Sequence, residues 1–112
     1  MIRLMNAAVM PREGNYALRR LTPAEFAALV QDAHAGQALA SYIGYPNAAD
    51  VLSELCGVPI PLNRESTPVE DGDTLLIARL VYRVDNPAAK GQVKATVADY
   101  EFFIARYTAL EN

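Results

Sequence analysis

The chain has 112 residues, which is enough for one hydrophobic core but not for two independent ones. Apolar residues make up 52% of it and charged residues 21%, which argues against an intrinsically disordered chain and predicts a single domain spanning residues 1–112. The formal net charge is -3, and this acidic balance makes broad binding to duplex DNA unexpected.

The first two elements are predicted to be strands. Residues 2–9 form a short apolar run that ends at Pro11 and Gly14. Residues 16–20 place Tyr16 and Leu18 on one side and Ala17 and Arg19 on the other, which predicts an edge strand. Asn6 interrupts the first run, and its amide needs hydrogen-bond partners. A bond to a neighbouring loop at the end of the strand explains Asn6 as well as a functional role does.

A first helix follows directly. Thr22-Pro23-Ala24-Glu25 is a capping box with proline at the first helical position. Apolar residues then recur at helical spacing until Gly36. His34 lies in the last turn, where we expect a solvated terminal side chain rather than a catalytic one.

A strand over residues 39–43 leads to a second helix. Tyr45-Pro46-Asn47 is predicted to form the turn between them, with Asn47 as the N-cap of a helix over residues 48–56 that stops at Gly57. The start of this helix comes shortly after a strand and Gly44. Its backbone amides and dipole are therefore suited to receive an anion.

The second half of the chain contributes one long strand and one shorter strand. Residues 58–73 are extended or loop-like. Residues 74–84 alternate between two faces, and the first half of this stretch is apolar on both faces, which places it in the centre of the sheet. A turn over residues 85–91 and one helical turn over 96–100 precede a last strand over 101–108. The element order predicts an α/β (α+β) fold: a mixed five- to six-stranded sheet flanked by two main helices.

Cys56 is the only cysteine and His34 the only histidine. One chain can therefore form neither a disulfide framework nor a four-ligand zinc site, and we predict no metal and no cofactor. No secretory signal and no run of membrane-spanning length is found. We expect a cytoplasmic protein with no membrane partner, located in the host cell cytoplasm if the gene is viral.

No glycine-rich phosphate loop, nucleophile elbow or metal-ligand run is present. What remains is a set of polar residues at the ends of apolar elements: Asn6, Gly44-Tyr45-Pro46-Asn47, Asn63-Arg64 and Arg83. Taken one at a time, each is explained by ordinary capping or by a surface ion pair. Taken together, they suit a ligand with phosphate groups, because arginine binds phosphate bidentately and asparagine can read an adenine edge.

The same residues carry a resemblance to a known family that extends from about residue 3 to about residue 108. The chain resembles small proteins of archaeal viruses, phages and mobile elements, a family that includes the viral ring nucleases, which act as anti-CRISPR proteins against type III systems. The matching motifs are Asn6-Ala7-Ala8, Ile43-Gly44-Tyr45-Pro46-Asn47, Leu52-Ser53-Glu54-Leu55-Cys56-Gly57, Asn63-Arg64, and Arg83 ahead of Gly91-Gln92-Val93.

This resemblance implies a homodimer whose interface holds cyclic tetra-adenylate. In the family, a ribose 2′-hydroxyl attacks its adjacent phosphate without a metal while a histidine assists proton transfer. Tyr45 stands where the family has that histidine, and Val9 and Asn47-Ala48 also depart from the family pattern. A phenol is a much weaker base than imidazole at neutral pH, although it can still donate a hydrogen bond.

The resemblance assigns catalytic roles to Tyr45 and Arg83, and ligand binding to the remaining polar residues: Asn6, Gly44, Asn47, Asn63 and Arg64. Three hypotheses follow. The leading one is a cyclic oligoadenylate binding protein that sequesters its ligand or cleaves it slowly. The alternatives are an active metal-independent ring nuclease and a non-enzymatic scaffold or host-interaction protein with the same fold.

Overall fold

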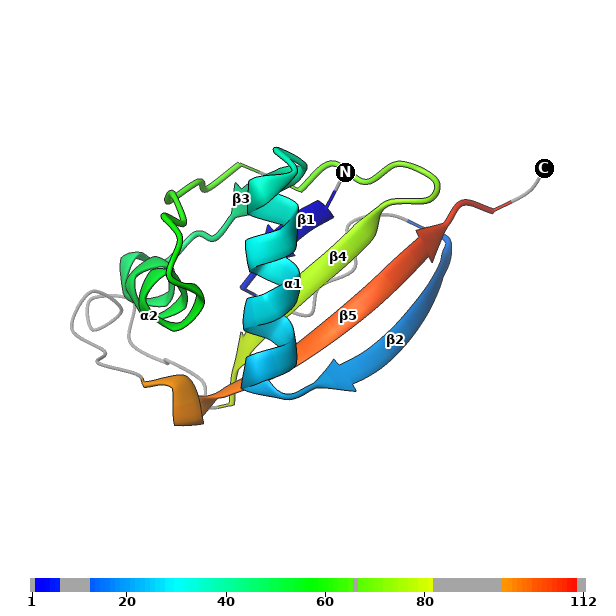
Figure 1. Cartoon of the computed structure of the whole chain (residues 1–112). Helices are drawn as coiled ribbons and strands as arrows, with labels where there is room; N and C mark the ends of the chain where they lie inside the picture. The colour runs from blue at the N-terminus through cyan, green and yellow to red at the C-terminus, as the bar shows by residue number, and fades with distance from the viewer. Residues whose placement is uncertain (1, 7–12, 66, 82–95, 111–112) are drawn as a thin grey trace.

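The computed structural model describes residues 2–6, 13–65, 67–81 and 96–110. They form a single five-stranded mixed sheet in the order β2-β5-β4-β1-β3 (Figure 1). β1 pairs in parallel with both β3 and β4, whereas β5 pairs antiparallel with both β2 and β4. The strands are β1 (Ile2–Met5), β2 (Asn15–Leu21), β3 (Leu39–Tyr42), β4 (Thr74–Leu80) and β5 (Tyr100–Thr108). The predicted α+β fold with a mixed sheet is confirmed.

Two helices, α1 (Pro23–Ala35) and α2 (Pro46–Cys56), lie on one face of the sheet (Figure 1). A short 3-10 helix, η2 (Val97–Asp99), precedes β5. The main core lies between the helices and this sheet face, and its fully buried side chains include Phe26, Val30, Leu52 and Phe102. The rings of Phe26 and Phe102 are 4.7 Å apart, so α1 packs directly on β5.

β4 lies in the centre of the sheet, as its sequence predicted. Leu76 and Ala78 belong to the core under the helices, whereas Leu75 and Ile77 belong to a second buried cluster. Burial of both faces explains why the first half of this strand is apolar on both sides. Of the stretch predicted to continue the strand, Val81 is a bend and residues 82–84 lie outside the described residues.

Several predicted boundaries shift by a few residues. β1 ends at Met5, so Asn6 follows the strand rather than interrupting it, and residues 7–9 of the predicted run lie outside the described residues. The prediction of Asn47 as the N-cap of α2 is wrong, because the helix begins at Pro46 and Tyr45 is its N-cap. Proline has the backbone angle of a first helical residue and no N–H to leave unpaired, so the helix starts there.

The start of α1 is as predicted. The Thr22 hydroxyl accepts from the Glu25 amide at 3.1 Å, and the Glu25 carboxylate accepts from the Thr22 amide at 2.9 Å. The bond from the Thr22 amide lowers the pKa of the exposed Glu25 carboxyl. Neither described helix is long and apolar enough to cross a membrane.

Candidate functional site

The candidate site lies where two parallel strands end. β1 and β3 run in the same direction, so their carboxyl ends meet at one edge of the sheet. Asn6 comes directly after β1, and Gly44 comes two residues after β3. The Asn6 Oδ1 atom accepts a hydrogen bond from the Gly44 amide at 3.0 Å. The bond to a neighbouring loop that the sequence allowed for Asn6 is therefore present, and it joins two residues predicted to bind ligand.

A third segment, residues 62–64, also contacts this part of the chain. Leu62 forms an isolated parallel bridge with Ile43, and the Asn63 amide donates to the Ile43 carbonyl at 2.9 Å. The next side chain, Arg64, donates from Nε to the Gly44 carbonyl at 3.1 Å. The Gly44 residue is thus held through its N–H by Asn6 and through its C=O by Arg64.

The Asn63 side chain is used to shape this segment. Its Nδ2 atom donates to the Ser41 carbonyl at 3.1 Å, and its Oδ1 atom accepts from the Glu65 amide at 3.0 Å. Both ends of the amide therefore bond to the backbone, and this positions the neighbouring Arg64. Ser41 was not singled out from the sequence, although a hydroxyl within an otherwise apolar strand was the available signal.

Arg64 is the exposed cation of this cluster. Its Nε–H is used by Gly44, which leaves the four N–H bonds of its two Nη groups for other acceptors. Among the described residues, no carboxylate forms a salt bridge with Arg64. A guanidinium group in this state is suited to bind an anion such as phosphate.

Tyr45 and Asn47 flank the start of α2 beside Gly44. Tyr45 is 40% exposed, and its carbonyl accepts from the Ala49 amide at 3.0 Å in the first helical turn. Asn47 is half-buried. The positive end of the α2 dipole therefore lies next to the Gly44 peptide and adds to the preference for an anion.

Gly44 has no evident structural need to be glycine. Its backbone is not in the left-handed region that favours glycine. A Cβ atom built there would meet the Arg64 Cγ and the Asn6 Oδ1 at 3.9 Å, which is ordinary contact. Close approach of a bound molecule is a remaining reason for glycine at such a position.

The seventh predicted residue, Arg83, lies outside the described residues. In the sequence it follows the last residue of β4 by three positions. The structure therefore brings together Asn6, Gly44, Asn63 and Arg64 through hydrogen bonds and places Tyr45 and Asn47 next to them along the chain. Within the described part of the chain, no group of three His, Cys, Asp or Glu side chains could hold a metal ion.

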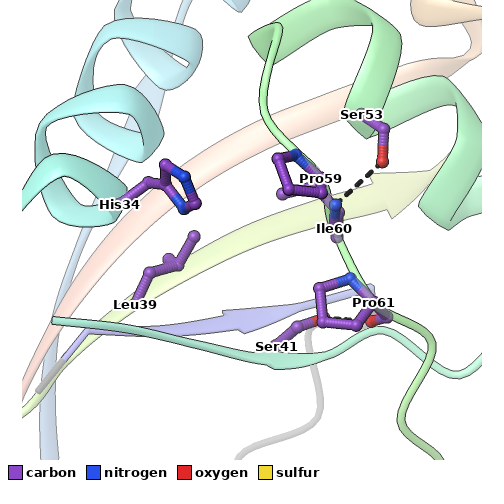
Figure 2. A pocket seen from close by; sticks show the side chains of 7 residues that line it. All are labelled: His34, Leu39, Ser41, Ser53, Pro59, Ile60 and Pro61. Atoms are coloured by element: carbon purple, nitrogen blue, oxygen red, sulfur yellow. Dashed lines mark hydrogen bonds between the residues drawn. The ribbon is translucent and has the colours of Figure 1, made fainter. Parts of the chain in front are cut away.

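A separate pocket of about 640 Å³ is lined in part by Ser41, and none of the predicted site residues lines it. Figure 2 shows His34 and Leu39 on one side of this pocket and the 59–61 segment on the other. The expectation of a merely solvated His34 is therefore incomplete, since the exposed imidazole forms part of a pocket wall. This pocket was not predicted from the sequence.

Comparisons with known proteins agree on the fold. A family model described as STIV B116-like matches residues 2–102. Among solved structures, the chain is similar to B116 of Sulfolobus turreted icosahedral virus, with a TM-score of 0.75 and 18% sequence identity over 93% of this chain and 97% of that one. No curated protein matches the sequence.

Proposed function

The chain belongs to the STIV B116-like family, and from this premise we propose that it binds a cyclic oligoadenylate at the edge formed by Asn6, Gly44 and Arg64. The observation that carries the proposal is the Gly44 peptide held between Asn6 and Arg64, with the guanidinium group exposed beside it. In sheets of this kind, ligands commonly bind outside the carboxyl ends of parallel strands. The ligand identity rests on the family resemblance seen in the sequence.

Each group in the cluster has a distinct role in the proposal. The Nη atoms of Arg64 bind a phosphate oxygen pair, and the start of α2 receives the same negative charge. The Nδ2 group of Asn6 donates to the ligand, because its Oδ1 atom already accepts from Gly44. Asn63 acts indirectly, since both ends of its side-chain amide bond to the backbone.

We propose sequestration with slow cleavage as the outcome of binding. Tyr45 is exposed beside Gly44, at the position where the sequence resemblance to the viral ring nucleases implies a histidine. General acid–base assistance contributes about 10²–10⁴ in rate, so a tyrosine there leaves mainly the contribution from aligning the 2′-hydroxyl. Arg83 is proposed to stabilise the charge at the reacting phosphate. A fast metal-independent ring nuclease is the second candidate. The observation that favours it is the exposed Tyr45 phenol, whose hydroxyl can reach a bound ligand.

We propose that the functional unit is a homodimer that acts in the cytoplasm, in the host cell if the gene is viral. Two symmetric copies of the cluster suit a ligand that is itself a symmetric ring. Light scattering at micromolar concentration should give twice the monomer mass. A monomer mass at every concentration up to 100 μM would contradict a site shared by two chains.

The decisive experiment measures binding and cleavage separately. Calorimetric titration with cyclic tetra-adenylate should show binding, and chromatography of the mixture should show little product. Arg64→Ala should weaken binding by about ten- to a hundredfold, because a charge-assisted hydrogen bond is worth about 1.5–3 kcal/mol. Arg19→Ala is the matched control, since it removes the same charge from β2 at the opposite edge of the sheet.

Three results would separate the hypotheses. A gain of cleavage in Tyr45→His supports sequestration by the natural protein and assigns the position to proton transfer. Fast cleavage that survives Tyr45→Phe would favour an active ring nuclease with its chemistry at Arg83 and Asn6. No binding to any cyclic oligoadenylate would leave the scaffold hypothesis.

A further inference from the structure

The outer edge of β3 is only partly covered. In a parallel pair, alternate residues of a strand bond to the same neighbour. The Ala38 carbonyl accepts from the Ile2 amide at 2.9 Å. The backbone N–H and C=O groups of even-numbered residues in this strand therefore point to β1, and those of odd-numbered residues point to the outer edge. On the outer side, the 59–63 segment meets the end of the strand at Ile43.

Two prolines stop this outer pairing before it reaches the start of β3. Continuing the ladder from Ile43 would require amide donors at Pro61 and Pro59, and proline has none. The Asn63 side chain replaces the first missing donor by bonding to the Ser41 carbonyl. Nothing among the described residues replaces the second, so the Leu39 carbonyl has no hydrogen-bond partner there. The Ser41 amide, which would donate to the Pro59 carbonyl if the ladder continued, has no partner among the described residues either.

These two backbone groups belong to residues that line the 640 Å³ pocket. Its wall is held firmly: the Ser53 hydroxyl accepts from the Ile60 amide at 3.0 Å, and the Ser41 hydroxyl donates to the Pro61 carbonyl at 2.7 Å. Figure 2 shows the His34 ring on one side of the space and the Pro59 ring on the other. The pocket therefore lies between the rings of His34 and Pro59, and two of its lining residues, Leu39 and Ser41, carry the carbonyl acceptor and the amide donor on the outer edge of β3.

We infer that this pocket binds an adenine base. The exocyclic N6 amino group would donate to the Leu39 carbonyl, and the ring nitrogen N1 would accept from the Ser41 amide, while the purine lies between His34 and Pro59. Single bases are commonly recognised by hydrogen bonds on this edge combined with stacking on flat side chains. A volume of about 640 Å³ is also in the usual range for small-molecule pockets.

The donor and acceptor order distinguishes adenine from other bases. A 6-oxopurine such as hypoxanthine carries an acceptor at position 6 and a hydrogen at N1, so both bonds are reversed. Cytosine has the same order as adenine, but its single ring covers less of the His34 and Pro59 faces. This site goes beyond the proposed function, because it binds a base without any contact to Arg64 or to phosphate.

The test uses nucleosides, which carry no phosphate. A ¹H–¹⁵N NMR titration with adenosine should shift the Ser41 amide resonance to saturation, and inosine should bind at least about tenfold more weakly. His34→Ala should weaken adenosine binding by about tenfold, the size of one base-stacking contact. Asp32→Ala is the control, since Asp32 is exposed on the same helix and does not line the pocket.

Equal binding of adenosine and inosine would overturn the inference, as would an unshifted Ser41 amide at millimolar adenosine. Arg64→Ala should leave adenosine binding unchanged. A protein that binds adenosine but no cyclic oligoadenylate therefore retains this site while losing the proposed function, and the reverse result retains the proposed function alone.

Discussion

The two halves of the sheet use polar side chains differently. In the antiparallel half, Glu101 on β5 accepts from Arg20 on β2 at 2.9 Å and from Arg79 on β4. These charged side chains bond to one another across strands that pair with each other along their length. In the parallel half, Asn6 and Arg64 bond instead to backbone groups beyond the strand ends.

This difference explains why the candidate site lies in the parallel half. Antiparallel neighbours pair their backbone groups along their whole length, and ion pairs between their side chains add a modest stabilisation. Parallel strands end together and leave backbone groups that the ladder cannot pair. Side chains that hold these groups also fix a loop next to a helix N-terminus, where a ligand can bind.

The largest effect on stability is expected at the opposite end of the parallel half. Arg3 on β1 donates from Nε to the Asp73 carboxylate at 2.8 Å, and both residues are buried. Asp73→Ala leaves the Arg3 charge without its partner and should lower the free energy of unfolding by about 3–5 kcal/mol. Urea unfolding checks this value, with the exposed Asp50→Ala as the control. A loss below about 1 kcal/mol would show that Arg3 reaches solvent.

The same ion pair predicts a loss of stability in acid. Burial raises the pKa of the Asp73 carboxyl, but the hydrogen bonds from Arg3 and the Glu70 amide outweigh it, so the pKa lies below its ordinary value. The stabilisation is therefore complete above the unfolded pKa of about 3.9 and is lost as the pH falls through the lower folded value. Asp73→Asn should unfold with a shallower dependence on pH in this range. Identical pH profiles for the two proteins would contradict the assignment.

At the candidate site, the Asn6 side chain is expected to contribute less to the free energy of unfolding than the Arg3–Asp73 ion pair does. Asn6→Ala removes the acceptor of the Gly44 amide and should cost about 1–2 kcal/mol, since solvent can reach this half-buried position. Asn6→Asp keeps an oxygen acceptor and should retain most of the stability. Equal losses in both variants, measured by thermal unfolding, would show that the hydrogen bond is not the cause.

In the antiparallel half, loss of the ion pairs should matter less. Glu101→Gln removes the charge that faces two exposed arginines and should cost about 0.5–1 kcal/mol. The difference from the natural protein should shrink in 1 M salt, because salt screens exposed charges. A cost that persists unchanged in high salt would point to packing rather than charge.

The smallest effect on stability, paired with a large effect on binding, is expected at Gly44. Gly44→Ala should change the free energy of unfolding by no more than about 0.5 kcal/mol, because its Cβ has room within the chain. Binding of cyclic tetra-adenylate should weaken by about tenfold or more if the added methyl group occupies ligand space. Unchanged binding would place the ligand away from Gly44 and leave the choice of glycine unexplained.

Local chemistry in the sequence was enough to predict most elements. The capping box at Thr22, the two helices and the alternation along β4 depend on residues close together in the chain, so spacing alone identifies them. The polar residues at the ends of apolar runs were found in the same way. The N-cap of α2 was mispredicted because Asn47 and Pro46 are competing local signals, and the fixed backbone angle of proline decided the helix start.

Only the tertiary structure decided which of these residues meet. Asn6 and Gly44 are 38 positions apart, and they bond because β1 and β3 pair in parallel and end at the same edge. No local pattern encodes that pairing, because strand order depends on burying both faces of β4 and one face of its neighbours at once. The pocket beside β3 has the same origin: Pro59 and Pro61 are visible in the sequence, but the missing donors matter only where the chain returns to that edge.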